Sequence, residues 1–306
     1  MISLENEDID NLERINGGIF GTVYKKDDTT AYKIYHDEVK NISGSPMINP
    51  ALTTNKLHYK LLLSRRDKIK KSDLIKDLIY INGRFKGVAI QYYNGPTISR
   101  STIPFKDKIR IARILIDKSK ELNNNLIYPT DYKTNNILIE NNDPKLIDLD
   151  DPRTHAFIYP SPLFRKCSIR AMGDTIEDML GQYNHLYLDK ETYKYITREK
   201  VFYPYTYKRI EDYINSKEKE KIIIFIDKDT DIDRLKDNTS IYNFNLVYLV
   251  EDNEKDYKRI IDNLKVYNIP LYDIHLKTKI DEYKDMDMIK YEYYFKDKEF
   301  KLVYKK

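Results

Sequence analysis

The sequence contains a single cysteine, Cys167, no tryptophan and only 9 glycines in 306 residues. One cysteine forms neither an intramolecular disulfide nor a thiolate-rich metal site, which excludes the disulfide-stapled class of small secreted domains. There is also no run of about 18 apolar residues, and the N-terminal segment MISLENEDID is acidic and lacks an apolar stretch. We therefore expect a soluble, intracellular protein of the cytoplasm, with no membrane partner.

Charge of one sign is not concentrated anywhere in the chain. The 53 Lys and Arg residues are nearly balanced by 49 Asp and Glu residues, and the net charge of +4 comes from interspersed side chains. Without a basic block, no counterion-release argument for nucleic acid arises, so we expect no nucleic-acid partner. A hydrophobic content of 41% indicates a globular protein, and the length suits two or three domain-sized units.

Residues 1–95 show the pattern of a β-rich unit. Three extended runs, LERIN, TVYKK and AYKIY, are separated by the turns GGIFG and DDTT, which predicts an antiparallel meander. Asn49 and Pro50 are a plausible cap and first residue for a helix over 51–63. Two further extended runs flank Asn82-Gly83, the dipeptide most typical of a tight hairpin. These elements predict an N-terminal lobe of five strands and one helix.

Residues 96–217 have mainly helical patterns. Apolar positions recur on one helical face from Phe105 to Leu122, and further helices are predicted over 169–180, 191–198 and 207–214. Between the first two helices lie two short apolar runs, Asn136–Ile139 and Leu146–Ile147, joined by the turn NNDP. This second unit is therefore predicted to be a helical lobe with a small β insertion.

After a charged run at 216–221, expected to be a linker, the pattern changes again. KIIIFID and LVYLVED are continuous apolar runs, typical of strands buried in a parallel sheet, and EKDYKRIIDNLKVY is an amphipathic helix followed by the run IPLYDIHL. A hairpin of alternating residues around KDKE ends the chain. Residues 220–306 are thus predicted to form a small α/β domain whose expected role is to recruit a protein partner.

Four polar residues in the first half of the chain point to chemistry. Lys33 lies in an apolar strand one strand after Gly17, Gly18 and Gly21, where a buried ammonium needs a partner. The alternative is a lysine on an edge strand that reaches into water. Glycines at such a turn let backbone amides approach phosphate oxygens, although an ordinary hairpin turn explains them equally well.

The other three polar residues lie between the predicted helices. Asp131 and Asn136 are five residues apart in a polar loop, a spacing that suits an acceptor-orienting carboxylate and a Mg²⁺ ligand. Asp148 ends an apolar run, where a carboxylate favours a metal or a buried cation, with helix capping as the alternative.

Together these segments resemble the protein kinase superfamily over about residues 10–215. INGGIFGTVYK is similar to the family's glycine-rich loop, with Asn16 in place of the first glycine, and AYKIY resembles its Ala-x-Lys strand. FKGVAIQYYNG is similar to the fifth strand and hinge, with Ile90 at the gatekeeper. YPTDYKTNNIL resembles the catalytic loop, LIDLDD stands where the family has Asp-Phe-Gly, and RAMGDTIEDMLG resembles the large central helix.

The resemblance implies a role for each site residue, with ATP and Mg²⁺ as cofactors. The catalytic residues would be Lys33 on the phosphates, Asp131 as the hydroxyl-orienting base and Lys133 as a charge stabiliser. Asn136 and Asp148 would bind the metal. The nucleotide-binding residues would be Gly18, Gly21, Val23, Ala31, Lys33, Gln91, Tyr93 and Leu138. Lys133, two residues after Asp131, is the family's choice in kinases that act on Ser or Thr.

Several positions depart from the family pattern. No Asp or Glu occurs between Glu38 and Asp67, so the helix predicted over 51–63 offers Lys33 no acidic partner. Thr130 replaces the arginine that reads activation-loop phosphorylation, Asp150 stands at the glycine of Asp-Phe-Gly, and Ser168 appears where the central helix begins with aspartate. The activation segment is short, and YPSPL around Pro162 is only loosely similar to its usual end.

Our sequence-based hypothesis is an α+β chain with a bilobal protein kinase-like fold, comprising a β-rich N-lobe (1–95) and a reduced helical C-lobe (96–217), followed by the small α/β domain (220–306). The expected activity is transfer of the ATP γ-phosphoryl group to Ser or Thr hydroxyls of a protein substrate. Two alternatives stay open. One is a catalytically weak or inactive kinase-like module that acts through its C-terminal domain, and the other is a kinase of small molecules.

Overall fold

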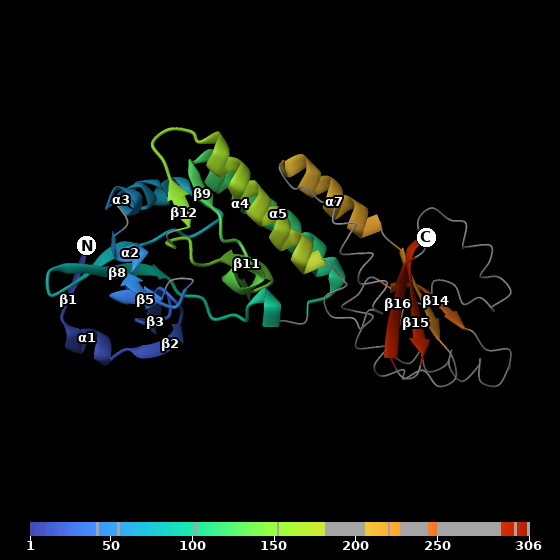
Figure 1. Cartoon of the computed structure of the whole chain (residues 1–306), viewed down its shortest axis with the longest axis horizontal. Coiled ribbons are helices and arrows are strands. Elements are labelled where there is room, and N and C mark those ends of the chain that lie inside the picture. Colours follow the sequence, from blue (N-terminus) through green and yellow to red (C-terminus); the bar gives the residue numbers. More distant parts are fainter. Residues whose placement is uncertain are drawn as a thin grey trace. The chain divides into compact units, whose positions relative to one another are not determined.

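The computed structural model describes ten stretches of the chain, namely residues 1–40, 43–53, 56–100, 103–151, 153–180, 206–219, 221–226, 244–249, 289–296 and 299–304. Within them the chain is a mixed α+β protein (Figure 1). One compact unit comprises the described parts of 1–101, 113–175 and 204–207, and a second comprises those of 102–112, 176–203 and 208–306.

The first unit is built on a six-stranded sheet in the order β1-β7-β8-β4-β3-β2. Its strands are β1 (Ile2–Leu4), β2 (Glu13–Gly17), β3 (Gly21–Lys25), β4 (Thr30–Tyr35), β7 (Asp77–Ile81) and β8 (Arg84–Gln91). Neighbouring strands are antiparallel except β1, which pairs parallel with β7. The five predicted strands are therefore confirmed, whereas the short edge strand β1 and helix α1 (Asn6–Asp10) were not predicted.

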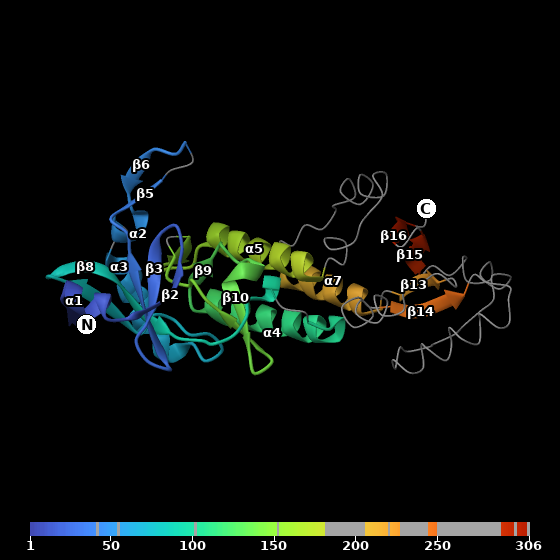
Figure 2. The ribbon, with the colours of Figure 1, turned by 90° about the horizontal axis from the view of Figure 1, so that it is seen from below.

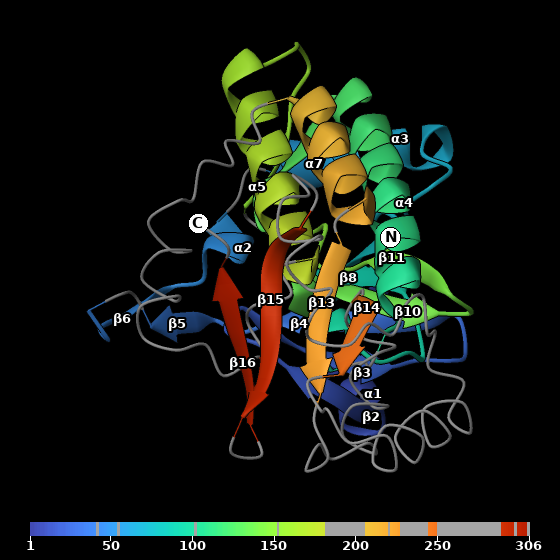
Figure 3. The same ribbon diagram turned by 90° about the vertical axis from the view of Figure 1, so that its right-hand side faces the viewer.

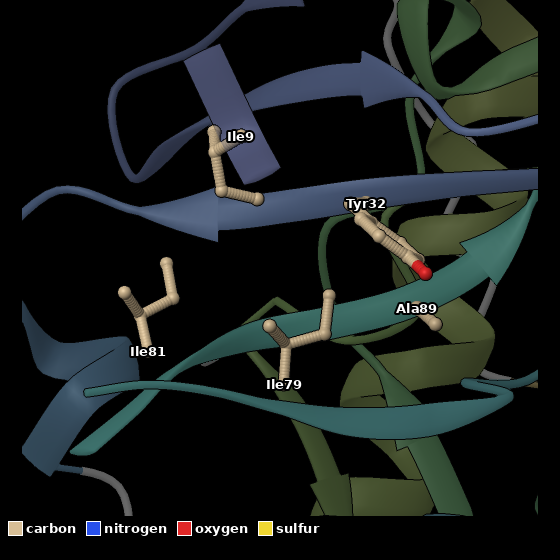
Figure 4. Close-up of a cluster of buried hydrophobic side chains, with 5 residues drawn as sticks. All are labelled: Ile9, Tyr32, Ile79, Ile81 and Ala89. Atoms are coloured by element: carbon tan, nitrogen blue, oxygen red, sulfur yellow. The ribbon is translucent and has the colours of Figure 1, made fainter. Parts of the chain in front are cut away.

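One face of this sheet has its own apolar core. Ile79 of β7 and Ala89 of β8 are almost fully buried, and α1 covers them through Ile9 (Figure 4). Tyr32 of β4 and Ile81 of β7 complete the cluster. Because side chains alternate along a strand, Tyr32 and Ile34 point into this core while their neighbours on β4 point to the opposite face.

Two local sequence signals within residues 1–95 are confirmed by the structure. Asn82 and Gly83 both have positive φ, at 50° and 75°, as a type I′ turn between β7 and β8 requires. The Asn49 side chain accepts a hydrogen bond from the Ala51 amide at 3.0 Å, as predicted for a helix cap.

The helix expected over 51–63 corresponds to α2 (Pro50–Thr53) and α3 (Lys56–Arg65), followed by the 3-10 turn η1 (Arg66–Lys68). A two-stranded ribbon of β5 (Glu38–Lys40) and β6 (Pro46–Ile48) precedes α2 and extends away from the sheet (Figure 2).

Between residues 98 and 180, the described part of the chain forms two long helices with short strands between them. The elements are η2 (Ile98–Arg100), α4 (Phe105–Asn124), β9 (Ile127–Pro129), η3 (Thr134–Asn136), β10 (Ile137–Glu140), β11 (Asp143–Leu146), β12 (Thr154–Ala156) and α5 (Pro162–Leu180). The helix predicted from Phe105 is confirmed. The two apolar runs form the β10–β11 hairpin, whose turn residues Asn141 and Asn142 have positive φ. The helix predicted from Ile169 begins seven residues earlier, with Pro162 at its first position.

Ser168 consequently lies inside α5 and not at a helix start. Its side chain is fully buried, and its hydroxyl donates to Asn123 Oδ1 of α4 at 3.0 Å. The same asparagine donates through Nδ2 to the Tyr207 hydroxyl at 2.6 Å. Ser168 is therefore a buried residue that connects α5 to α4. The helix start predicted at Ile169 is wrong, because α5 begins at Pro162.

Strands of the second unit confirm the parallel pairing predicted near residue 221. Helix α7 (Tyr207–Lys219) continues through most of the charged run expected to be a linker. The strands β13 (Lys221–Ile226), β14 (Phe244–Leu249), β15 (Ile289–Lys296) and β16 (Glu299–Tyr304) form a sheet in the order β14-β13-β15-β16 (Figure 3). Both neighbours of β13 are parallel to it, and β15–β16 is the expected antiparallel hairpin. The helices predicted at 191–198 and in EKDYKRIIDNLKVY, and the run IPLYDIHL, lie outside the described residues.

No helix in the described parts of the chain combines the length and the apolarity that crossing a bilayer requires.

Candidate functional site

Lys33 lies on the face of the sheet opposite to the apolar core. It alternates along β4 with Tyr32 and Ile34, so it shares its face with Ala31 and Tyr35. Its Cα partners are Val23 on β3 and Val88 on β8, which place the lysine in the interior of the sheet and not at an edge. The alternative of an edge-strand lysine reaching into water is therefore wrong, since the side chain is only 7% exposed.

The Lys33 ammonium forms ion pairs with two carboxylates. Its Nζ lies 2.9 Å from Asp148 Oδ1 and 3.0 Å from Asp150 Oδ2. Burial alone would lower the pKa of Lys33, but the charges of Asp150 and Asp148 outweigh it and raise the pKa above its usual value. Lys33 therefore carries a positive charge at all physiological pH values.

Sequence reasoning missed Asp150 as the partner of Lys33. The family resemblance points to the helix after β4 for this carboxylate, whereas Asp150 lies 117 residues after Lys33 in the sequence. Asp150 is 1% exposed, and it also accepts a hydrogen bond from the Tyr35 hydroxyl at 2.7 Å. Burial, together with the charge of Asp150, raises the pKa of Tyr35 well above 10, so this phenol remains a donor. The one signal in the sequence was Asp150 itself, which stands in LIDLDD where the protein kinase superfamily has the glycine of Asp-Phe-Gly.

Asp131 lies in the loop between β9 and η3. The Asn136 side-chain amide donates to the Asp131 carbonyl oxygen at 3.1 Å and to its Oδ2 at 3.2 Å, and Lys133 Nζ lies 2.9 Å from the same Oδ2. The predicted spacing of five residues thus does bring Asp131 and Asn136 together. Asn136 is buried, and its backbone amide bonds to the Lys133 carbonyl at 2.8 Å, which fixes the loop.

Arg153, which sequence analysis did not single out, joins this loop to the segment after Asp148. Its guanidinium binds Asp151 through two bonds, at 2.8 and 3.0 Å, and lies 2.8 Å from Asp131 Oδ2. The Arg153 carbonyl accepts bonds from the amide and hydroxyl of Thr130, at 3.1 and 2.7 Å. Burial would raise the pKa of Asp151, but the hydrogen bonds from Arg153 reverse the effect and lower it. An arginine five residues after Asp148 was the only available signal.

The segment that carries Asp148, Asp150 and Asp151 is a tight turn. Asp148 has a left-handed backbone with φ of 61°, a conformation that costs most residues about 1–2 kcal/mol and that Asp tolerates better than others. The Asp151 amide bonds to the Asp148 carbonyl at 3.1 Å, and the Ile147 amide bonds to the Asn136 carbonyl at 3.0 Å. These bonds hold the turn beside the Asp131 loop, so the two ion-pair groups form one network.

Two residues outside the glycine turn between β2 and β3 form hydrogen bonds to it. The Phe20 carbonyl accepts bonds from the His36 amide at 3.0 Å and from the buried Asn49 side chain at 2.6 Å. At Gly21 a Cβ would come within 2.5 Å of the Ile34 carbonyl oxygen, so close strand packing requires a glycine there. The Gly18 amide is bonded to the Gly21 carbonyl at 2.8 Å, and it is therefore already satisfied within the turn.

The segment from Gln91 to Gly95 joins the sheet to β10. Gln91 pairs with Thr30 at the end of β8, and the Tyr93 hydroxyl donates to Asp73. A Cβ on Gly95 would lie 2.2 Å from the Ile139 carbonyl oxygen, so the absent side chain allows this segment to lie directly against β10. There, Thr97 bridges to Leu138. Of the remaining predicted nucleotide-binding residues, Ala31 is 1% exposed on the Lys33 face of β4.

The residues predicted to bind metal form a small donor set. Among the described residues no cluster of three or more His, Cys, Asp or Glu side chains has the geometry of a metal site. Asp148 supplies one carboxylate that is 34% exposed, and the backbone bond between Ile147 and Asn136 keeps the Asn136 amide nearby. Such a set is too small to hold a metal alone, but it fits Mg²⁺, which usually takes one or two carboxylates and completes its shell with phosphates and water.

Comparisons with known proteins add no family assignment. No protein-family model matches the sequence, and a search of the curated proteins finds no significant match.

Proposed function

We propose that this chain is a protein kinase-like phosphotransferase that moves the γ-phosphoryl group of ATP to a Ser or Thr hydroxyl, and that residues 1–95 and 96–217 act as its two lobes. One observation carries the proposal. Lys33, Asp131 and Asp148, from three distant segments, belong to one network of ion pairs and hydrogen bonds. Phosphoryl transfer needs these components, namely a cation for the phosphates, a metal ligand and a carboxylate that orients the acceptor.

Each side chain has a defined task in this reaction. Lys33 neutralises charge on the non-transferred phosphates, and Asp131 accepts a hydrogen bond from the acceptor hydroxyl and then its proton. The hydroxyl oxygen forms the new bond to the γ-phosphorus while the bond to the bridging oxygen breaks, and ADP leaves. Lys133, 2.9 Å from Asp131, offsets the negative charge that develops on the transferred group.

Magnesium would be held by Asp148 and Asn136, and it would neutralise the negative charge on the phosphates. Asp148 suits this task because its carboxylate is one-third exposed and so can turn from Lys33 to a ligand. The Asn136 amide nitrogen faces Asp131, which directs its side-chain oxygen away from that carboxylate.

The test of this proposal is phosphoryl transfer with matched variants. Purified protein is incubated with γ-labelled ATP and Mg²⁺, and both label transfer and the thermal shift caused by MgATP are measured. We expect transfer by the wild type and a loss of at least about 100-fold in Asp131→Asn, because a positioned base contributes about 10²–10⁴.

The control for this test is Asp67→Asn, which changes an exposed carboxylate outside the network and should leave both signals intact. Absence of both transfer and thermal shift in the wild type, with Mg²⁺ or Mn²⁺, would refute the proposal.

A nucleotide-binding module without transfer activity is the second candidate, and the state of Asp131 favours it. Its Oδ2 is engaged by Lys133, Arg153 and Asn136 together, and an acceptor hydroxyl must displace at least one of these donors. Such a module would act through a protein partner of residues 220–306. A MgATP thermal shift without label transfer to any protein would support it over the active kinase.

A small-molecule acceptor is favoured by a different observation. Only β12 and a short loop separate Asp148 from Pro162, the first residue of α5, so little chain is available for docking a peptide. ADP release that depends on an added alcohol, amine or sugar and not on a protein would identify this case.

A further inference from the structure

The buried ammonium of Lys33 needs a permanent anionic partner, and the helix after β4 does not supply one. No Asp or Glu occurs between Glu38 and Asp67. Helix α3 instead contributes Tyr59, which is 2% exposed, packs against the Tyr35 ring at 6.3 Å and donates its hydroxyl to the Ala51 carbonyl at 3.0 Å. Helix α3 therefore contributes an aromatic ring beside Tyr35 and no carboxylate. The anionic partner of Lys33 has to come from another segment of the chain.

The two carboxylates that contact Lys33 differ in what else they can do. Asp148 is 34% exposed, whereas Asp150 is 1% exposed. Asp150 is further held by the Tyr35 hydroxyl at 2.7 Å, on the same face of the same strand as Lys33. A buried carboxylate with two donors is expensive to move, while a partly exposed one can exchange its partner for a ligand.

We propose that Asp150 is the positioning residue of Lys33, and that with Tyr35 it holds the ammonium toward the nucleotide phosphates when Asp148 turns to the metal. This inference rests on the proposed function. It assigns different tasks to two aspartates two residues apart, with Asp148 facing the ligand and Asp150 fixing the lysine. No helix has to swing in to complete the site, because the lysine's partner belongs to the turn that carries the metal ligand.

The arrangement sets the direction of Lys33 before the metal binds. The Asp151 amide bonds to the Asp148 carbonyl across the turn, so Asp148 and Asp150 share one rigid segment. A nucleotide that recruits the metal to Asp148 therefore meets a lysine whose direction is already set. Pre-organisation of this kind lowers the entropic cost of binding phosphate.

Steady-state kinetics of folded variants test the inference. Asp150→Asn is expected to lower kcat/KM for ATP about tenfold or more, with the Mg²⁺ concentration for half-maximal rate unchanged, and Asp150→Glu should restore part of the loss. Asp148→Asn should instead raise the Mg²⁺ requirement. Asp67→Asn serves as the exposed control. A folded Asp150→Asn protein with wild-type kcat and KM would overturn the inference.

Two further measurements separate folding from function. If Asp150→Asn does not fold, Tyr35→Phe removes one donor and keeps the carboxylate, and it should lower kcat/KM about threefold or more. Wild-type kinetics for Tyr35→Phe would then contradict the inference.

If the wild type binds no ATP, the proposed function fails, but melting temperatures still decide the pairing. The losses in Lys33→Met and Asp150→Asn should add to more than the loss in the double variant, whereas strict additivity would show that the two residues are not coupled.

Discussion

The two faces of the N-terminal sheet are stabilised in opposite ways, although the same strand contributes to both. Toward α1, Tyr32 and Ile34 of β4 join an apolar cluster whose stability follows buried area. Toward the site, Lys33 and Tyr35 depend on a few charged groups, above all on Asp150, which contacts both of them. The first face should therefore lose stability gradually as its side chains become smaller, whereas the second should lose much of its stability when one charge is removed.

The largest effect is expected at Lys33. Lys33→Met leaves the carboxylate of Asp150 buried without its cation, which should reduce the free energy of unfolding by about 3–5 kcal/mol. Lys86→Met is the matched control on the neighbouring strand β8, because its partner Asp37 is 74% exposed and such pairs contribute about 0–1 kcal/mol. Urea denaturation measures both. Equal losses in the two variants would show that the site face does not depend on its ion pairs.

The apolar face should respond to a change of volume. Ile79 is fully buried, so Ile79→Ala should lower the free energy of unfolding by about 3 kcal/mol while the nucleotide affinity of the folded molecules stays unchanged. Ile48→Ala, at a side chain that is 66% exposed, should change stability by no more than about 0.5 kcal/mol. If Ile79→Ala also weakened ATP binding in folded protein, the two faces would not be energetically separate.

The buried side chain of His58 should make the free energy of unfolding depend on pH. Burial, with a smaller contribution from the charge of His155, lowers the pKa of His58 from 6.5 to about 4, and its Nε2 has no hydrogen-bond partner within the described residues. Between pH 6.5 and 4 the unfolded chain therefore binds more protons than the folded one, so the free energy of unfolding falls as the pH is lowered, by about 2 kcal/mol.

Denaturation at pH 7 and pH 4.5 measures this loss. His58→Phe should remove most of it, and the loss that remains should reflect His155, whose pKa burial also lowers. An unchanged pH dependence in the variant would contradict the assignment.

A smaller effect is expected at Asn49, which links the helix start to the glycine turn. Asn49→Ala removes the cap on α2 and the bond to the Phe20 carbonyl, and should lower stability by about 1–2 kcal/mol. Faster amide exchange in residues 17–21 should accompany this loss. Asn11→Ala, which removes only an exposed bond to the Glu7 carbonyl, should leave exchange in the turn unchanged.

Local sequence signals predicted five strands of the N-terminal sheet and the long helices, but not the long-range partners. The Asn82-Gly83 hairpin and the Asn49 cap depend on residues within a few positions, so their chemistry is visible in the sequence. The pairing of Lys33 with Asp150 depends on how two distant segments pack, and no periodicity records it. The start of α5 was missed because residues 162–168 lack a clear apolar stripe, and only Pro162 marks the first turn.

The sequence likewise predicted only part of the candidate site. Lys33, Asp131, Asn136 and Asp148 were chosen by residue type and order, and they belong to one network in the structure. Tyr35, Arg153 and Asp151 were not chosen, because a tyrosine in a strand and charges in a loop have no distinctive pattern on their own. Their roles follow only from burial and from the atoms that they contact.

Binding of MgATP to the wild type, to Asp148→Asn and to Asp67→Asn, measured by calorimetry at constant ionic strength, is decisive for the phosphotransferase proposal. We expect binding by the wild type and by Asp67→Asn, and an affinity at least about tenfold weaker in Asp148→Asn, because only that variant loses a carboxylate beside Lys33. Equal affinities in all three proteins, or no binding by any of them, would contradict the assignment of this network as a nucleotide-phosphate site.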